Sequence, residues 1–277
     1  MSDRLDGSLV GALEAFGTPD GAALLVALDF DGTLAPLVDD PTAARMTPGA
    51  RAAVDRLGAL VSDGGGAARV RLAFVSGRDL DDLAARADPP PGSYLVGSHG
   101  AQTGHATAQG LESVPLELSI AQRGTLAALN DALAAAVAGR EGAWVQHKPS
   151  AAVLHTRQAG PEDTAAAVEA AEAAASRLGL TAMHGKDVVE IAVLETSKGE
   201  ALERLRGVVA DDVGSDVSRV LYAGDDTTDE KAFAVLGDGD LTLKVGDGET
   251  LAAHRVPGAD DVAAVLDTLS EAIAAGP

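Results

Sequence analysis

Two acidic clusters, each directly after an apolar run of strand length, could bind a divalent cation. In the first, Asp29 and Asp31 are separated by one residue, and Gly32 permits a tight turn that brings both carboxylates to one pocket. The second cluster contains Asp225 and Asp226. Neighbouring carboxylates need a counter-charge, or one of them must take up a proton. A divalent cation supplies that charge, and oxygen ligands favour Mg²⁺, so the clusters predict a Mg²⁺ site with few protein ligands.

Two further segments carry groups that can bind phosphate oxygens. Ser76 ends another apolar run, and Lys198 opens a predicted helix. A hydroxyl and an ammonium can offset negative charge in a phosphoryl transition state. Each of these residues also has a structural interpretation, because Asp and Ser after a strand often cap the next helix or form a turn. Polar residues at the ends of three apolar runs, Asp29, Ser76 and Asp225, together favour a functional site.

The elements that must position these residues alternate between strand and helix. Apolar runs of strand length span residues 22–28, 70–75, 94–96, 219–223 and 241–245. Helical patterns span residues 48–60, 80–87, 198–209, 229–236 and 259–274. This alternation predicts an α/β domain with a parallel sheet. In such sheets ligands bind at the carboxyl ends of the strands, where the polar residues described above would lie.

The middle of the chain, from about residue 103 to residue 187, has a different pattern of helices and hairpins. Two alanine-rich helices are predicted over residues 125–137 and 162–178. Paired strands are predicted for residues 143–147 with 151–157 and for residues 180–183 with 188–192. We therefore expect a core domain of residues 1–102 and 188–277, with an α+β domain of residues 103–187 inserted in it.

The composition argues against several classes of function. The 42 acidic side chains exceed the 21 basic ones and give a net charge of −21, which argues against a general nucleic-acid binder. The absence of cysteine excludes disulfides, thiolate metal sites and cysteine nucleophiles. Residues 1–6 lack the pattern of a signal peptide, and no apolar run reaches the roughly 18 residues of a membrane span. We expect a cytoplasmic protein without nucleic-acid or membrane partners, and we expect it to be a monomer.

The order of the motifs resembles the haloacid dehalogenase-like hydrolase superfamily. The resemblance rests on Asp29-Phe30-Asp31-Gly32-Thr33, then Ser76-Gly77-Arg78, then Lys198-Gly199, and finally Gly224-Asp225-Asp226-Thr227-Thr228-Asp229-Glu230. Within the superfamily the chain resembles the trehalose-6-phosphate phosphatase family, from residue 28 to about residue 265. Gly97-Ser98-His99-Gly100-Ala101 and the segments 148–157 and 185–190 carry this closer resemblance. It implies a Rossmann-like parallel sheet core with an inserted α+β cap domain that closes over the substrate and determines specificity.

The resemblance also implies a role for each site residue. Asp29 would be the nucleophile, and Asp31 would act first as general acid and then as general base. Ser76 and Lys198 would bind the phosphoryl group. Mg²⁺ would be held by the Asp29 carboxylate, the Asp31 carbonyl and Asp225, with Asp226 and Asp229 supporting the metal waters or Lys198. The implied substrate contacts are Thr33, Gly77, Arg78, His99, Lys148, His155, Arg157, Lys186 and Glu190.

The function implied by the resemblance is Mg²⁺-dependent hydrolysis of trehalose 6-phosphate, a small-molecule sugar phosphate, through an aspartyl-phosphate intermediate in trehalose biosynthesis. Other functions stay open on the sequence. A phosphatase for sucrose 6-phosphate or a glycosyl-3-phosphoglycerate would use the same residues. A phosphomutase would retain and reorient a phosphorylated product. A non-catalytic sugar-phosphate sensor is a further alternative, against which the complete set Asp29, Asp31, Lys198 and Asp225 argues.

Overall fold

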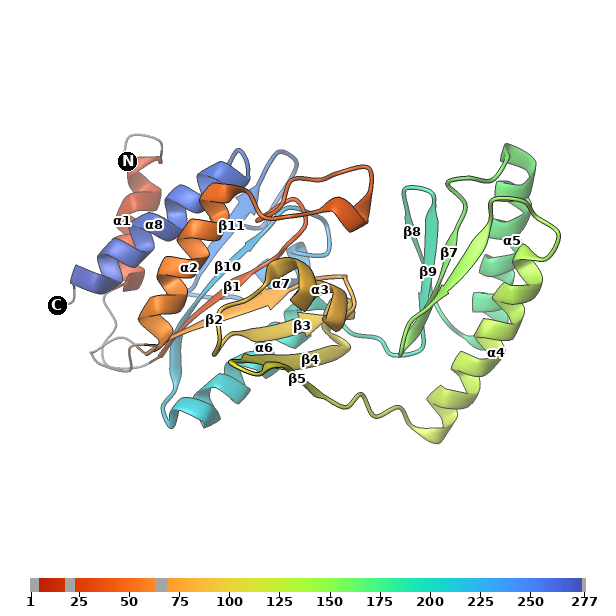
Figure 1. Cartoon of the computed structure of the whole chain (residues 1–277), viewed down its shortest axis with the longest axis horizontal. Helices are drawn as coiled ribbons and strands as arrows, with labels where there is room; N and C mark the ends of the chain where they lie inside the picture. The colour runs from red at the N-terminus through yellow and green to blue at the C-terminus, as the bar shows by residue number, and fades with distance from the viewer. Residues whose placement is uncertain (1–4, 18–22, 63–68, 276–277) are drawn as a thin grey trace. The chain divides into compact units, whose positions relative to one another are not determined.

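The computed structural model describes residues 5–17, 23–62 and 69–275 of the chain (Figure 1). Residues 1–4, which belong to the segment examined for a signal peptide, and Ala22, at the start of the first predicted strand, lie outside the described residues. The chain forms two compact units. The larger unit comprises Met1–Val114 and Thr196–Pro277, and the smaller unit comprises Pro115–Glu195.

The larger unit is built on an eight-stranded sheet with the order β12-β11-β10-β1-β2-β3-β4-β5. Its strands are β1 (Ala23–Leu28), β2 (Arg69–Val75), β3 (Tyr94–Gly97), β4 (Gln102–Thr107), β5 (Gly110–Val114), β10 (Val217–Gly224), β11 (Leu241–Val245) and β12 (His254–Val256). Neighbours from β12 to β3 are parallel, whereas β4 and β5 are antiparallel. The predicted α/β fold with a mostly parallel sheet is therefore confirmed.

Helices cover both faces of this sheet, which explains why β1 is apolar throughout and completely buried. The helices of the larger unit are α1 (Gly7–Gly17), α2 (Pro48–Ser62), α3 (Leu80–Ala87), α6 (Lys198–Val213), α7 (Glu230–Phe233) and α8 (Ala259–Ala275). Leu24 and Val26 belong to the core formed with α1, α2 and α8. Leu25 and Ala27 point to the other face, into the core formed with α6 and α7. Short 3₁₀ turns, η2 (Pro41–Ala43) and η3 (Ser98–Gly100), lie in the connections.

The smaller unit is a four-stranded antiparallel sheet with the order β6-β7-β9-β8. Its strands are β6 (Trp144–His147), β7 (Ala151–His155), β8 (Ala182–Gly185) and β9 (Val188–Ala192). Its helices, α4 (Ile120–Val137) and α5 (Pro161–Leu178), share a core with Leu154, Val189 and Ile191 on one face of the sheet. Because side chains alternate along a strand, the residues directly before and after each of these three belong to the opposite face. The predicted α+β insert is confirmed in its architecture.

The division between the units corrects the predicted boundaries at 103 and 187. Strands β4 and β5 form an antiparallel extension of β3, so residues 102–114 belong to the larger sheet. Strand β9 pairs with both β7 and β8, so the chain leaves the smaller unit only after residue 195. The first error arose because hairpin strands look alike in sequence whichever sheet they extend. The boundary at 187 divided a strand pair, residues 180–183 with 188–192, that the sequence had predicted and that the structure contains as β8 and β9.

Some predicted elements have other ends in the structure. The helix predicted over residues 229–236 is α7 (Glu230–Phe233). It ends early because the amides after Ala234 bond three residues back rather than four, from Val235 to Ala232 and from Leu236 to Phe233. Strand β7 ends at His155 rather than at 157. The amide of Thr156 donates to the Asp187 carbonyl at 2.9 Å, and the chain then turns. Within the described part of the chain, no helix has both the length and the hydropathy to cross a membrane.

Candidate active site

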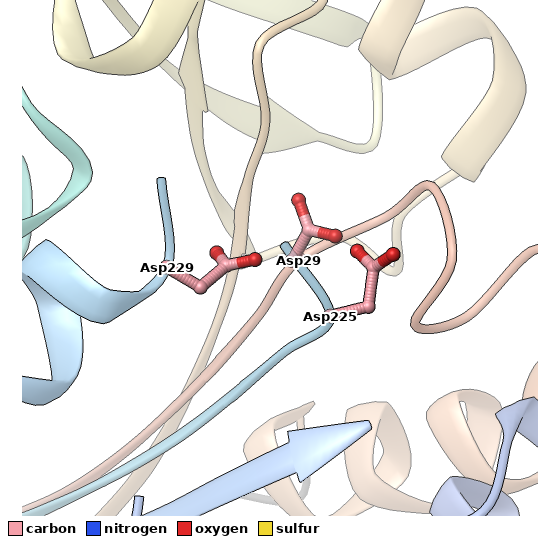
Figure 2. A group of neighbouring side chains, drawn as sticks. All are labelled: Asp29, Asp225 and Asp229. Atoms are coloured by element: carbon pink, nitrogen blue, oxygen red, sulfur yellow. The ribbon is translucent and has the colours of Figure 1, made fainter. Parts of the chain in front are cut away.

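Adjacent parallel strands bring the two acidic clusters to one edge of the larger sheet. Leu28 at the end of β1 is in register with Ala223 of β10, and the amide of Asp29 donates to the Ala223 carbonyl at 2.9 Å. Asp225 follows the last residue of β10. Carboxylate oxygens of Asp29, Asp225 and Asp229 all lie within 4.8 Å of one another, and Figure 2 shows these side chains converging. The sequence prediction that the acidic clusters meet is confirmed.

A buried lysine connects Asp29, the predicted nucleophile, to Asp229. Lys198, the first residue of α6, is only 3 % exposed. Its Nζ donates to Asp29 Oδ1 and to Asp229 Oδ1, each at 2.7 Å. Burial alone lowers the pKa of Lys198, but the charges of Asp29 and Asp229 outweigh it and raise that pKa above its ordinary value. Lys198 is therefore a permanent cation beside Asp29.

Asp229 is completely buried and accepts hydrogen bonds at both carboxylate oxygens. Oδ1 accepts the Tyr222 hydroxyl at 2.7 Å in addition to Lys198, and Oδ2 accepts the Asp226 amide at 3.0 Å. Burial and the neighbouring acids, Asp229 first, raise the pKa of Tyr222 well above its ordinary value, so the hydroxyl keeps its proton and acts as a donor. These bonds fix the Asp229 carboxylate in contact with Lys198.

The pKa values of the other carboxylates at the site show where positive charge is lacking. Burial, with contributions from Asp229 and Asp226, raises the pKa of Asp225 to about 6. Burial also raises the pKa of Asp29, and Asp229 adds to this effect, although Lys198 opposes it. For Asp226, burial is outweighed by Lys198 and by bonds from Thr228, which lower its pKa. A cation bound between Asp29 and Asp225 would relieve their repulsion.

The site suits a hard divalent cation such as Mg²⁺, because its donors are carboxylate oxygens on adjacent strand ends. Gly32 is part of this fit. Its backbone has φ +80°, and a Cβ at this position would lie 2.0 Å from Asp225 Oδ2. Only glycine leaves space here for the Asp225 carboxylate. The residues of this structure therefore fit the predicted metal, although the sequence motif alone did not show why glycine is required.

Asp31 lies apart from the three converging carboxylates and is held by an arginine. Arg78 Nε donates to Asp31 Oδ2 at 2.6 Å, and a terminal nitrogen donates to Asp31 Oδ1 at 2.7 Å. Arg78 also donates to Asp82 on α3 at 2.6 Å and to the Pro41 carbonyl at 3.0 Å. Arg78 was predicted to contact the substrate; in this structure its guanidinium pairs with Asp31, the predicted acid–base.

The other predicted residues of the larger unit gather around the end of β2. Ser76 is buried, its Oγ accepts the Arg78 amide at 3.2 Å, and its carbonyl accepts the His99 amide at 3.0 Å. The His99 ring lies over Gly77, where a Cβ would come within 2.4 Å of it. Thr33 is buried, and its hydroxyl has no hydrogen-bond partner among the described residues. The structure thus brings Ser76, Gly77 and His99 together.

Sequence reasoning missed Tyr222 and Lys244 in the larger unit. Lys244, on β11, is 4 % exposed, and its Nζ donates to the main-chain carbonyl of Asp225. Its Cα is paired with that of Gly224, directly before Asp225. Both residues carry a polar group between two buried apolar neighbours in their strand, which is the signal that could have identified them.

In the smaller unit, predicted sugar contacts lie on the sheet face opposite the helices. Lys148 Nζ donates to both Glu190 oxygens, at 3.0 and 3.1 Å. His155 Nε2 contacts Gln146 Oε1 at 3.0 Å, and its ring stacks on Trp144 with centroids 4.0 Å apart and planes at 4°. Burial and the nearby Lys148 lower the pKa of His155, so its imidazole is neutral at pH 7. Gln146 and Trp144 were not predicted.

Arg157 and Lys186 lie at the ends of these strands rather than within them. Arg157 was predicted to end the strand of residues 151–157, but it lies in the exposed turn after β7. Lys186 lies in the exposed turn between β8 and β9, where the next residue, Asp187, has φ +60°. The strand placement of Arg157 was therefore wrong.

Comparison with known proteins agrees with this geometry. The family model described as trehalose-phosphatase matches residues 27–262. A trehalose-phosphate phosphatase of Mycobacterium marinum is 33 % identical over 258 residues, covering 89 % of this chain and 61 % of that protein. One from Mycobacterium tuberculosis is 31 % identical over 290 residues, covering 99 % of this chain and 69 % of that protein. The chain thus spans less than two thirds of the length of the first of these relatives.

Solved structures show the same fold. The C-terminal domain of the Candida albicans trehalose-6-phosphate phosphatase has a TM-score of 0.72 and 20 % identity, over 95 % of this chain and 96 % of that one. An Aspergillus fumigatus trehalose-6-phosphate phosphatase has a TM-score of 0.66 and 24 % identity, over 96 % of this chain and 98 % of that one. Because the trehalose-phosphatase family model matches residues 27–262, the chain belongs to the trehalose-phosphatase family.

Proposed function

We propose that the chain hydrolyses trehalose 6-phosphate to trehalose and phosphate, in a Mg²⁺-dependent reaction at Asp29. The observation that carries the proposal is the buried Asp29 carboxylate, held by Lys198 and converging with Asp225 at the sheet edge. The proposed substrate is supported by the membership of the chain in the trehalose-phosphatase family. A carboxylate nucleophile beside a fixed cation is suited to phosphoryl transfer, in which charge must be stabilised and groups positioned.

The reaction would proceed in two balanced steps. An Asp29 oxygen forms a bond to phosphorus while the bond from phosphorus to the sugar oxygen breaks, and that oxygen takes a proton from Asp31. Asp31 then takes a proton from water, whose oxygen bonds to phosphorus while the bond to Asp29 breaks, releasing phosphate. Lys198 and Ser76 would bind phosphoryl oxygens throughout, and Arg78 would hold Asp31 in place between the steps.

The metal would be held by the Asp29 carboxylate, the Asp31 carbonyl and the Asp225 carboxylate. Asp226 and Asp229 would support this set. The Asp229 carboxylate accepts hydrogen bonds from the Asp226 amide and from Lys198. When bound, Mg²⁺ supplies positive charge that offsets the charge of the transferring phosphoryl group.

The smaller unit would act as the specificity domain. We infer that the open face of its sheet binds the sugar, because the Lys148–Glu190 pair offers both donors and acceptors for hydroxyl groups. Neutral His155 can donate with one ring nitrogen and accept with the other. The other proposed substrate contacts are Thr33, Gly77, His99, Arg157 and Lys186.

The test is phosphate release by the purified protein from a panel of sugar phosphates. Trehalose 6-phosphate, sucrose 6-phosphate, a glycosyl-3-phosphoglycerate and glucose 6-phosphate are compared, each with Mg²⁺ and with a chelator. We expect the highest kcat/KM for trehalose 6-phosphate and loss of activity with the chelator. Equal turnover of all four would contradict the proposed substrate, and an isomerised sugar phosphate as product would identify a mutase. Asp29→Asn should abolish turnover without unfolding the protein.

A further inference from the structure

A buried chain of hydrogen bonds extends from the nucleophile position to a tyrosine that the mechanism has not used. Asp29 Oδ1 accepts Lys198 Nζ, the same Nζ donates to Asp229 Oδ1, and Tyr222 donates to that Asp229 oxygen, each at 2.7 Å. All four residues are at most 3 % exposed. Water therefore cannot replace any of these partners without a rearrangement of the core.

Asp229 is the branch point of this chain, and its orientation fixes the lysine. The Asp226 amide holds Oδ2 at 3.0 Å, while the Tyr222 hydroxyl holds Oδ1. These two donors belong to a main-chain amide and to a packed ring, so they set the orientation of the carboxylate, whereas the third donor, Lys198 on Oδ1, is carried by a flexible stem. A lysine ammonium is a point charge on a flexible stem, so its position depends on the acceptors around it. If Oδ1 lost its tyrosine donor, the carboxylate could turn and draw Nζ away from Asp29.

The tyrosine ring is anchored independently of its hydroxyl. Tyr222 lies on β10, is completely buried and packs edge-on against Phe233 of α7, with ring centroids 5.8 Å apart. Phenylalanine would keep these apolar contacts and remove only the donor. The substitution is therefore specific to the hydrogen bond.

We propose that Tyr222 is a positioning residue for phosphoryl transfer, whose hydroxyl orients Asp229 so that Lys198 stays against Asp29. The inference rests on the proposed function, since Lys198 must be in place while the bond from Asp29 to phosphorus forms and the bond to the leaving oxygen breaks. It adds to that function a residue that touches neither substrate nor nucleophile.

The chain offers a matched control, because it contains 2 tyrosines. Tyr94 on β3 also donates its hydroxyl to an aspartate, Asp212 Oδ2, at 2.6 Å. Asp212 belongs to α6 and lies outside the carboxylate cluster of Asp29, Asp225 and Asp229. Tyr94→Phe therefore removes a tyrosine–aspartate bond at the end of α6 remote from Lys198.

The experiment compares Tyr222→Phe with Tyr94→Phe, using the sugar phosphate that the wild-type protein hydrolyses fastest. For Tyr222→Phe we expect kcat to fall about tenfold or more, since hydrogen bonds to charged groups are among the strongest, with KM within about twofold of wild type. The inhibition constant of orthovanadate, a phosphoryl mimic that needs no turnover, should rise by a similar factor. Tyr94→Phe should leave all three constants within about twofold of their wild-type values. Thermal unfolding is measured for both variants.

Three results would overturn the inference: unchanged kcat in Tyr222→Phe, equal losses in the two variants, or a loss explained by the unfolded fraction. The outcomes separate this inference from the proposed function. If wild type prefers another sugar phosphate, the proposed substrate fails while the comparison of the two tyrosines still decides the role of Tyr222. If wild type neither hydrolyses a phosphate ester nor binds orthovanadate, both proposals fail.

Discussion

Asp29 and Asp31 are held by different cations, and this difference assigns them different tasks. Asp29 is buried and contacts Lys198 at one oxygen. Asp31 is more exposed, and both of its oxygens accept from Arg78. In the proposed mechanism, buried Asp29 would attack phosphorus, and the more exposed Asp31 would be accessible to the leaving group and to water.

The Arg78–Asp31 contact predicts the effect of a substitution that keeps the charge. Arg78→Lys replaces a planar bidentate donor by a point charge, so Asp31 loses its fixed orientation. We expect kcat for trehalose 6-phosphate to fall about ten- to a hundredfold. The control is Arg56→Lys, since Arg56 Nε donates to Asp267 at 3.0 Å on the α2–α8 side of the unit. Similar losses in both variants, measured by steady-state kinetics, would mean that Arg78 only stabilises the fold.

The pKa of Asp225 predicts how metal binding depends on pH. Burial and its acidic neighbours raise this pKa to about 6, and protonation below that value removes a negative ligand. Mg²⁺ binding should therefore be present above pH 6 and weaken as the pH falls through 6. Because the folded-state pKa is raised, the metal-free protein should lose stability as pH rises from about 4 to about 6, and Mg²⁺ should offset this loss at higher pH. Calorimetric titration with Mg²⁺ across this range tests the prediction, and a pH-independent affinity would contradict it.

At the scale of the elements, the sequence was sufficient to predict which segments form the strands that end at the site. It was not sufficient to predict the sheet to which the β4–β5 hairpin belongs. Strands β1, β2, β10 and β11 are apolar runs that the core requires, so their positions follow from burial alone. The destination of the β4–β5 hairpin depends on pairing with β3, which lies outside any local pattern. Likewise, Asp29 and Asp225 were predictable as strand-end acids, whereas the contacts of Tyr222 with Asp229 and of Lys244 with the Asp225 carbonyl are evident only in the folded structure.

The turn after β1 is the element most sensitive to substitution. Gly32→Ala would force an alanine to φ +80° and place its Cβ 2.0 Å from Asp225 Oδ2. We expect loss of Mg²⁺-dependent activity and destabilisation of about 1–3 kcal/mol. Gly207, exposed on α6 with nothing near its missing Cβ, provides the control. Gly207→Ala should be active and slightly more stable, by roughly 0.5–1 kcal/mol. Thermal unfolding and activity assays distinguish the variants, and an active Gly32→Ala protein would contradict the close approach.

At the scale of the whole molecule, a net charge of −21 acts against an anionic substrate. A cavity of about 550 Å³ beside Gly32 and Asp225 adds to this field, since its lining includes Asp247, Asp260 and Asp261. Positive charge at the site is instead supplied by single lysines, such as Lys198, which contacts Asp29, and Lys244, which contacts the Asp225 carbonyl. The expectations of a cytoplasmic location, a monomeric state and no nucleic-acid partner stay predictions.

This charge distribution predicts an unusual salt dependence. Screening of the acidic surface should raise kcat/KM for trehalose 6-phosphate about two- to fivefold between low salt and about 0.15 M, because approach of the dianion is repelled at long range. The increase should be absent from kcat measured at saturating substrate. A steady fall of kcat/KM with salt would instead show that local positive charge dominates the approach.

The most direct measurement of the central claim is the transfer of the phosphoryl group from trehalose 6-phosphate to Asp29. Asp31→Asn should slow both steps, formation of the aspartyl-phosphate because the general acid is lost and its hydrolysis because the general base is lost, so the phosphorylated protein should be long-lived once it has formed. This variant is mixed with trehalose 6-phosphate and Mg²⁺, quenched in acid, digested and examined by peptide mass spectrometry, with the released trehalose counted. The account predicts one phosphoryl group on the peptide that contains Asp29 and one trehalose per site. Trehalose release with Asp29 unmodified, or a label on another residue, would contradict it.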